Sequence, residues 1–144
     1  MGLLRGHAAL TRALNADLVA DHGLTLNDYE VLLRLSRAPD RQMRRVDLAE
    51  QVLLTASGIT RLLDGLQASG YVDKAACSSD ARVTYAVLTD AGIDKLRSAA
   101  GVHIAGIRAK FAERYSDDEL VALAELLARL DASEPDGEAC TPDG

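Results

Sequence analysis

The chain has 144 residues and a formal net charge of −6, and 48% of its residues are hydrophobic while only 3% are aromatic. A length of this order predicts one compact domain, elaborated at most by a dimer interface. Many aliphatic and few aromatic side chains favour packed helices over an aromatic-rich β-sandwich. No apolar run approaches 18 residues and no secretory leader is recognisable, so we expect a cytoplasmic protein.

The sequence offers no cofactor or metal site. Its two cysteines, Cys77 and Cys140, are too few for a disulfide framework, and no Cys/His cluster has the spacing of zinc ligands. There is also no nucleophile–base pair and no phosphate-binding loop, and the three histidines lack catalytic partners. We therefore expect a protein that is not an enzyme.

The net negative charge of the chain comes from its C-terminal part. Residues 112–144 contain ten acidic and two basic side chains, a net charge of −8, so residues 1–111 carry +2. Although the whole chain is acidic, residues 1–111 can therefore still bind a polyanion. Residues 132–144 are polar and contain Gly and Pro, which predicts an acidic, disordered tail.

The first part of the chain predicts two helices. Apolar residues recur three and four positions apart over 3–20, as on one face of a helix, and Gly23 is a C-terminal signal. Thr25 and Asp28 form a capping-box-like pair that begins the second helix, which Pro39 ends.

The segment 46–70 predicts a helix-turn-helix. A short helix over 46–54 is followed by a tight turn and then by a helix whose apolar residues fall at helical spacing. If those apolar residues are buried, the second helix exposes Asp64 and, near its N-terminal end, Ser57, Gly58, Thr60 and Arg61. Gly58 lets the backbone come close to a partner, and the other three carry polar side chains. Such side chains bind phosphates or read base edges, although an ordinary amphipathic helix has a similar polar face.

A β-hairpin is predicted next, with strands at 71–76 and 84–88 around the polar run CSSDARV. We expect Val72, Tyr85 and Val87 to share its apolar face.

This hairpin loop carries one arginine, Arg82, beside the predicted recognition helix, and a minor groove attracts such arginines. Asp80 would repel phosphate, and we expect it instead to accept a hydrogen bond from the guanidinium of Arg82 and orient it.

Two further helices follow the hairpin. Thr89 is expected to cap a long helix from Asp90 to about Tyr115, and Ser116 with Glu119 begins a last one. The fold class is therefore mostly α with a small β-hairpin wing: a winged helix-turn-helix at 23–88, an N-terminal helix at 1–22 and C-terminal helices at 89–131.

Taken together, these motifs resemble the MarR family of winged-helix transcription regulators over residues 3–131. The resemblance rests on LTLNDYEVLLRLSRAP, DLAEQVLLTASGITRLLDGLQASGYV and DARVTYAVLTDAG, the last of which matches the family's wing pattern. It implies a homodimer in which the helices at 1–22 and 89–131 are the dimerisation helices. Its two DNA-binding lobes would lie on a pseudo-palindromic operator of double-stranded DNA, and the protein would act as a ligand-responsive repressor. The residues that match the family's DNA contacts are Thr55, Ser57, Gly58, Thr60, Arg61, Asp80 and Arg82.

The chain departs from the family pattern at two positions. Many relatives carry a second arginine in the wing where this chain has Ala81, and a charged residue where it has Gly65. Both departures are expected to weaken phosphate contacts.

Members of the family often bind small phenolic or anionic molecules between the dimer helices and the DNA-binding lobe. Here His7, Arg12 and His103 are the candidate effector contacts, because they are polar residues on or near apolar stripes. For the histidines, an ordinary core or interface role is the alternative. Cys77 stands at the mouth of the wing and is expected to be an incidental thiol.

The competing function is a winged helix used for protein–protein contact or dimerisation. An apolar exposed face over residues 55–64 would favour that reading, whereas a polar face with arginine favours DNA. In this sequence the predicted face is polar.

Overall fold

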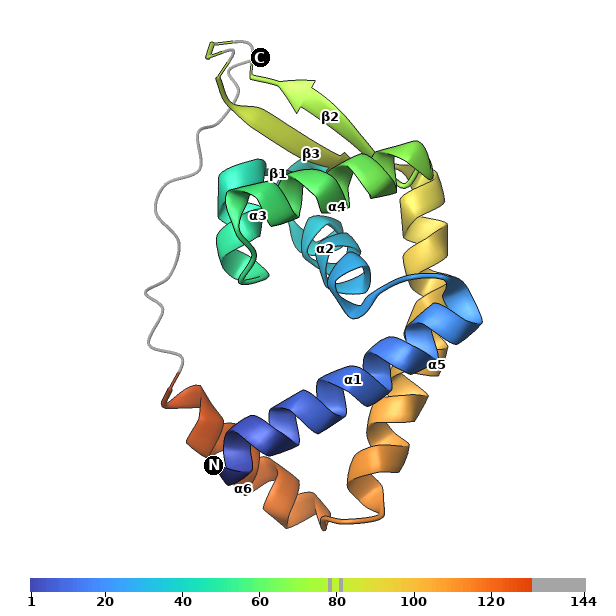
Figure 1. Ribbon diagram of the computed structural model, residues 1–144, viewed down its shortest axis with the longest axis vertical. Helices are drawn as coiled ribbons and strands as arrows, with labels where there is room; N and C mark the ends of the chain where they lie inside the picture. Colours follow the sequence, from blue (N-terminus) through green and yellow to red (C-terminus); the bar gives the residue numbers. More distant parts are fainter. Residues whose placement is uncertain (78, 81, 131–144) are drawn as a thin grey trace. The chain divides into compact units, whose positions relative to one another are not determined.

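The computed structural model describes residues 1–77, 79–80 and 82–130. The chain divides into two compact units, Met1–Ile107 and Arg108–Gly144, which are considered separately. In chain order, the first unit holds α1 (Gly2–His22), α2 (Leu26–Arg37), the 3-10 turn η1 (Pro39–Arg41), β1 (Gln42–Arg44), α3 (Arg45–Gln51), α4 (Ala56–Ala68), β2 (Val72–Ala76), β3 (Thr84–Leu88) and most of α5 (Asp90–Ala112) (Figure 1). The end of α5 and α6 (Asp117–Ala128) belong to the second unit.

The predicted fold class is confirmed. The first unit is mostly helical and contains a three-stranded antiparallel sheet in the order β1-β3-β2. Helices α3 and α4 form the helix-turn-helix, and β2 and β3 form the hairpin beside α4 (Figure 1). No helix in the described part of the chain is long and apolar enough to cross a membrane.

The predicted helix signals also hold. Gly23 follows α1 in the left-handed conformation, with φ 64°, which glycine adopts without steric cost. The Thr25 hydroxyl accepts a hydrogen bond from the N–H of Asp28 at 3.1 Å, and the Asp28 carboxylate accepts one from the N–H of Thr25 at 2.8 Å. This capping box satisfies two N–H groups that the first turn of α2 would otherwise leave unpaired.

The core of the first unit lies beneath the helix-turn-helix. Its largest fully buried side chains come from α1, α2, α3, α4 and β2: Leu18, Val31, Leu32, Leu35, Leu48, Ile59, Leu63 and Val72. Burying each such aliphatic side chain stabilises the fold by roughly 1.5–3 kcal/mol before chain entropy is counted. This shared core holds α4 with its polar face outward.

The sheet corrects two expectations from the sequence. Strand β1 was not predicted, because three residues after Pro39 carry no local pattern; it exists through pairing with β3, from Gln42 opposite Val87 to Arg44 opposite Tyr85. The prediction that Tyr85 and Val87 of β3 share the apolar face of the hairpin with Val72 was also wrong.

On that strand it is Ala86 and Leu88 that are buried, and Leu88 lies opposite buried Val72. Tyr85 and Val87 are half-buried. Since directly opposed residues share a face, the pairing register places Tyr85 and Val87 on the other side of the sheet.

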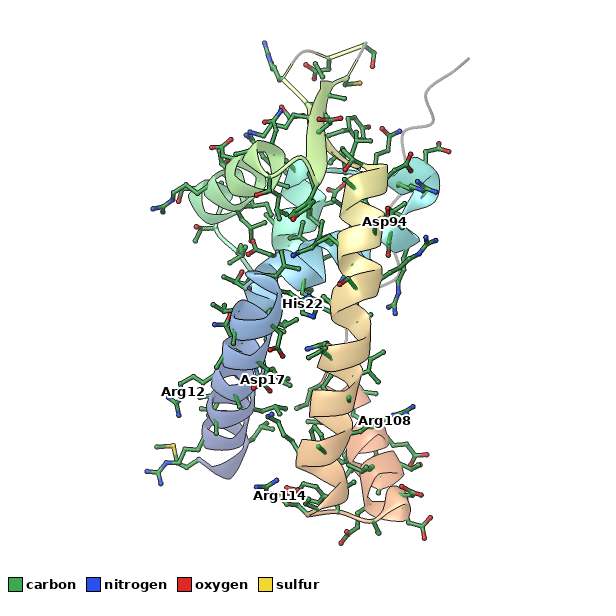
Figure 2. All side chains as sticks on the ribbon, turned by 90° about the vertical axis from the view of Figure 1, so that its right-hand side faces the viewer. Arg12, Asp17, His22, Asp94, Arg108 and Arg114 are labelled. Atoms are coloured by element: carbon green, nitrogen blue, oxygen red, sulfur yellow. The ribbon has the colours of Figure 1, made fainter. Side chains whose placement is uncertain are left out.

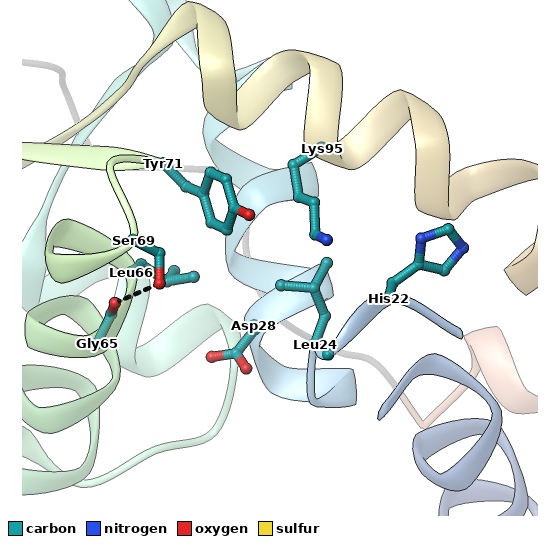
Figure 3. A pocket seen from close by; sticks show the side chains of 9 residues that line it. His22, Leu24, Asp28, Gly65, Leu66, Ser69, Tyr71 and Lys95 are labelled. Atoms are coloured by element: carbon teal, nitrogen blue, oxygen red, sulfur yellow. Dashed lines mark hydrogen bonds between the residues drawn. The ribbon is translucent and has the colours of Figure 1, made fainter. Parts of the chain in front are cut away.

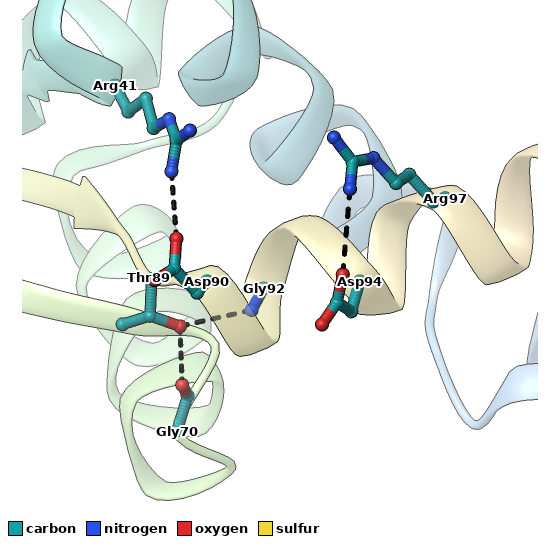
Figure 4. Close-up of polar contacts among 7 residues, drawn as sticks. All are labelled: Arg41, Gly70, Thr89, Asp90, Gly92, Asp94 and Arg97. Atoms are coloured by element: carbon teal, nitrogen blue, oxygen red, sulfur yellow. Dashed lines mark hydrogen bonds and ion pairs between the residues drawn. The ribbon is translucent and has the colours of Figure 1, made fainter.

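The hairpin passes into α5 through a compact junction (Figure 4). The Thr89 hydroxyl donates to the carbonyl oxygen of Gly70 at 2.7 Å and accepts from the N–H of Gly92 at 3.0 Å. The N–H of Thr89 also donates to the carbonyl oxygen of Tyr71 at 3.1 Å. Thr89 therefore caps α5, as predicted, and ties its first turn to the end of α4.

Several long apolar side chains on the predicted dimerisation helices are exposed. On α1 these are Leu3 and Leu4, and on α5 they include Ile104, which is 47% exposed, whereas Leu96 on the same helix is buried. In the second unit, Ser116 and Glu119 form the predicted capping box of α6, and Val121 and Leu126 are exposed. The predicted tail at 132–144 lies outside the described residues.

Candidate nucleic-acid interface

The N-terminal end of α4 is exposed and polar. Thr55 is its N-cap residue: the Thr55 hydroxyl accepts from the N–H of Gly58 at 3.1 Å and lies 3.3 Å from the Ser57 hydroxyl. Thr55 and Ser57 are both exposed, and Gly58 is half-buried. The hydroxyl groups and the first N–H groups of the helix therefore meet at one surface, an arrangement that suits an anion such as phosphate.

A glycine at position 58 also suits the cap itself. A Cβ at this position would come 3.1 Å from the Thr55 hydroxyl oxygen, closer than an ordinary van der Waals contact. A side chain there would press on the capping group. The sequence indicated a close approach of the backbone to DNA, and the structure adds this intramolecular reason.

The next turn presents Thr60 and Arg61. The Thr60 hydroxyl donates to the carbonyl oxygen of Ala56 at 2.7 Å and keeps its lone pairs available. Arg61 is exposed, and its Nε lies 3.5 Å from the carbonyl oxygen of Ser57. That single long contact leaves most of the guanidinium donors for an external partner.

One polar contact between α4 and the hairpin was not foreseen from the sequence. Lys74 of β2 forms an ion pair with Asp64 of α4. The ammonium group offsets an acidic charge on the recognition helix, which would otherwise disfavour phosphate, and links that helix to the wing. The two residues are ten positions apart, on a helix and on the strand that follows it, so helical or strand periodicity alone does not reveal the contact.

The wing loop is braced by Asp80, but not in the way the sequence suggested. The Asp80 carboxylate accepts from the main-chain N–H of Arg82 at 2.9 Å, and the N–H of Val83 donates to the Asp80 carbonyl oxygen at 3.0 Å. Among the described residues, the guanidinium of exposed Arg82 has no ion-pair partner. Asp80 therefore shapes the loop and leaves the arginine side chain free. Ala81 lies outside the described residues.

Cys77 stands at the base of this loop. Its Sγ lies 3.1 Å from the Ser79 hydroxyl oxygen, and hydrogen bonding to Ser79 lowers the pKa of the thiol. Cys140 lies outside the described residues, and the described part of the chain contains no group of three His, Cys, Asp or Glu side chains arranged to hold a metal.

The three candidate effector residues are not gathered in one place. His7 and Arg12 are exposed on α1, and in Figure 2 Arg12 points away from α5. His103 is half-buried on α5, with its ring centroid 4.4 Å from that of Tyr29. Burial lowers the pKa of His103, and its buried Nδ1 has no hydrogen-bond partner in the described part of the chain.

A different set of residues lines a pocket of about 280 Å³ behind the recognition helix (Figure 3). Its polar groups include Ser69 after α4, Tyr71 before β2 and Lys95 on α5, and His22 and Asp28 also line it. The Lys95 ammonium lies 5.7 Å from the centroid of the Tyr71 ring. None of His7, Arg12 and His103 lines this pocket, which touches both the recognition helix and α5.

Comparison with known proteins agrees with this geometry. Residues 22–83 match a family model described as MarR family. The chain is 32% identical over 111 residues to the HTH-type transcriptional repressor YetL of Bacillus subtilis, an alignment that covers 77% of this chain and 66% of YetL.

Solved structures show the same fold. The MarR family transcriptional regulator AbsC of Streptomyces coelicolor superposes with a TM-score of 0.81 and 32% identity, over 90% of this chain and 86% of AbsC. The regulator Sco3205 from the same organism, solved in complex with DNA, superposes with a TM-score of 0.83 and 27% identity, over 90% of this chain and 81% of that one. The winged helix-turn-helix of the present chain, its motifs and these relatives agree: the chain belongs to the MarR family of transcriptional regulators, which are non-enzymatic DNA-binding proteins.

Proposed function

We propose that this chain is a sequence-specific repressor that acts in the cytoplasm as a homodimer on a pseudo-palindromic operator. The observation that carries the proposal is the exposed polar N-terminal end of α4, with Thr55, Ser57 and Arg61, beside a wing whose Arg82 side chain is unpaired among the described residues. The recognition helix would enter the major groove and Arg82 the adjacent minor groove. Thr55, Ser57, Gly58, Thr60, Arg61 and Arg82 are the proposed contacts, with Asp80 shaping the wing.

Exposed apolar side chains support the homodimer. Leu3 and Leu4 on α1, Ile104 on α5, and Val121 and Leu126 on α6 are each exposed in the single chain. Large apolar surfaces of this kind in a small protein mark interfaces. A two-fold dimer would present its two recognition helices to half-sites about one helical turn apart, ~34 Å.

Repression is proposed from the relative YetL, which is named as a repressor. A polar, arginine-bearing face over residues 55–64 argues against the alternative, a winged helix used only for protein contact, because such a face would be expected to be apolar at its centre.

The proposed ligand response has two candidate locations. His103 keeps a buried, unpartnered Nδ1 beside Tyr29, and the pocket behind α4 offers Lys95, which forms no ion pair within the described residues. The pocket is the better supported of the two, since a ligand there would touch both α4 and α5 and so could change their relative position. His7 and Arg12 remain proposals that rest on the resemblance alone.

Selection of bound duplexes from a random pool by the purified protein tests the function. The expected result is an enriched inverted repeat whose half-site centres are about one helical turn apart. Enrichment of a single half-site would contradict the dimer, and the absence of any enrichment would contradict sequence-specific binding.

A further inference from the structure

The segment that joins α2 to α3 is rich in arginine, yet it belongs neither to the recognition helix nor to the wing. Within residues 34–45 it carries Arg34, Arg37, Arg41, Arg44 and Arg45. Two of these pair with acids: Arg34 with Glu30 on α2 at 3.1 Å, and Arg41 with Asp90 at the start of α5 at 3.0 Å (Figure 4).

Strand β1 separates Arg44 and Arg45 from Arg41 in space. Gln42 lies opposite Val87, near the end of β3 that leads into α5, whereas Arg44 lies opposite Tyr85, one residue after β3 leaves the wing loop. Arg44 is the last residue of β1, whereas Arg41 ends the turn η1 that immediately precedes the strand, so the length of β1 lies between them. Arg44 and Arg45 are thus at the wing end, and Arg41 is at the opposite end.

The two arginines at the wing end differ in their partners. Arg44 donates two hydrogen bonds to the Asp47 carboxylate, at 2.6 and 2.9 Å, and 44% of its side-chain surface remains exposed. Arg45 is half-buried and forms no ion pair within the part of the chain that the structure describes. Arg44, Arg45 and Asp47 together therefore carry a net positive charge beside the wing, with Asp47 holding the guanidinium of Arg44 in one orientation.

We propose that Arg44 and Arg45 form a third DNA contact, in which they bind backbone phosphates next to the minor groove that Arg82 enters. Phosphate oxygens match the guanidinium as a carboxylate does, so a phosphate can share or replace Asp47 as the partner of Arg44. The contact strengthens binding without reading sequence. This inference rests on the proposed mode of DNA binding.

Three charge-neutralising variants test the inference: Arg44→Gln, Arg45→Gln and, as the matched control, Arg41→Gln. Each removes one positive charge from the same segment, and thermal unfolding of each confirms that it folds. Affinity is measured between 50 and 200 mM salt on two duplexes, one recovered by selection with the wild-type protein and one with the same composition in scrambled order.

For Arg44→Gln and Arg45→Gln, the slope of log affinity against log salt is expected to fall by about one, because each variant loses one phosphate contact. The ratio of wild-type to variant affinity then shrinks about 3.5-fold between 50 and 200 mM salt. The loss is expected on both duplexes, and Arg41→Gln is expected to keep the wild-type slope.

A second pair of variants removes the acids. Asp47→Asn removes a negative charge beside Arg44 and is expected to tighten binding about twofold, whereas Asp90→Asn removes the same charge at the far end of the sheet and is expected to have a smaller effect. Equal slopes for all three arginine variants, or equal effects of both asparagine variants, would overturn the inference and leave only a general effect of net charge. Failure of the wild-type protein to bind either duplex would overturn the proposed function as well.

Discussion

Gly92 on the first turn of α5 lies directly against the carbonyl oxygen of Tyr71, so that a Cβ at position 92 would be 2.2 Å from that oxygen and 2.7 Å from a methyl carbon of Leu88. The same turn is tied to the end of α4 by Thr89, whose hydroxyl bonds both Gly70 and Gly92. These contacts pack the first turn of α5 closely against the end of α4 and the start of the hairpin.

Substituting Gly92 by alanine is therefore expected to destabilise the fold by about 2–3 kcal/mol, as overpacking against a rigid main chain does. Gly101→Ala on the same helix is the matched control, because a Cβ there meets no atom within 4 Å and alanine is a better helix former by roughly 1 kcal/mol. Chemical denaturation of both variants measures the difference. If Gly92→Ala were as stable as the wild type, the close packing of this junction would be wrong.

Asp80 is expected to act through its oxygen atom rather than its charge, because its carboxylate accepts from the main-chain N–H of Arg82. Asp80→Asn keeps an acceptor and removes a negative charge from the DNA-facing loop, so it should bind DNA at least as tightly as the wild type. Asp80→Ala loses the acceptor and should bind about fivefold more weakly, equivalent to roughly 1 kcal/mol. Weak binding by both variants would instead indicate that the charge of Asp80 orients the guanidinium.

Arg61 and Arg82 are expected to differ in what they contribute to DNA binding. Arg61→Ala should cost roughly 1–3 kcal/mol and relax the choice of bases within the half-site. Arg82→Ala should weaken binding and reduce the preference for A·T pairs at the flanking positions, where a narrow minor groove attracts the guanidinium. Arg97→Ala, which removes an exposed arginine from α5, is the control. Repeating the selection with each variant measures the change in base preference. If Arg61→Ala and Arg82→Ala both kept the wild-type preferences, these contacts would be refuted.

The stability of the fold is expected to depend on the protonation of His103. Burial lowers the pKa of His103 below its ordinary value of 6.5, so the folded state binds this proton less readily than the unfolded state. Stability should accordingly be intact above that value, and should fall as the pH drops through 6.5 towards the lower pKa of the folded state. At a pH below the pKa of His103 in both states, this contribution to stability is lost completely.

His103→Phe should remove this part of the pH dependence, because phenylalanine keeps the ring beside Tyr29 without a titrating nitrogen. Melting temperatures of the two proteins between pH 7.5 and 5.5 check the expectation. Parallel curves for wild type and variant would show that other groups account for any pH dependence.

Much of the local structure could be read from the sequence, because its signals act over a few residues. The Thr25–Asp28 and Ser116–Glu119 capping boxes, the Gly23 terminus of α1 and the cap at Thr89 depend only on near neighbours along the chain. The spacing of Ile59, Leu63 and Leu66 was likewise enough to decide which side of α4 would be polar.

Contacts between distant segments required the tertiary structure. The register of β3 decides that Ala86 and Leu88 face the core, and a shift of one residue would have exchanged them with Tyr85 and Val87. Strand β1 exists only through β3, and it alone brings Arg44 to the wing end of the sheet. Sequence patterns record the preferences of single segments, whereas the core that segments share decides how they pack together. The Lys74–Asp64 ion pair, the close packing of Gly92 and the position of Arg44 and Arg45 near the wing all depend on such packing between segments.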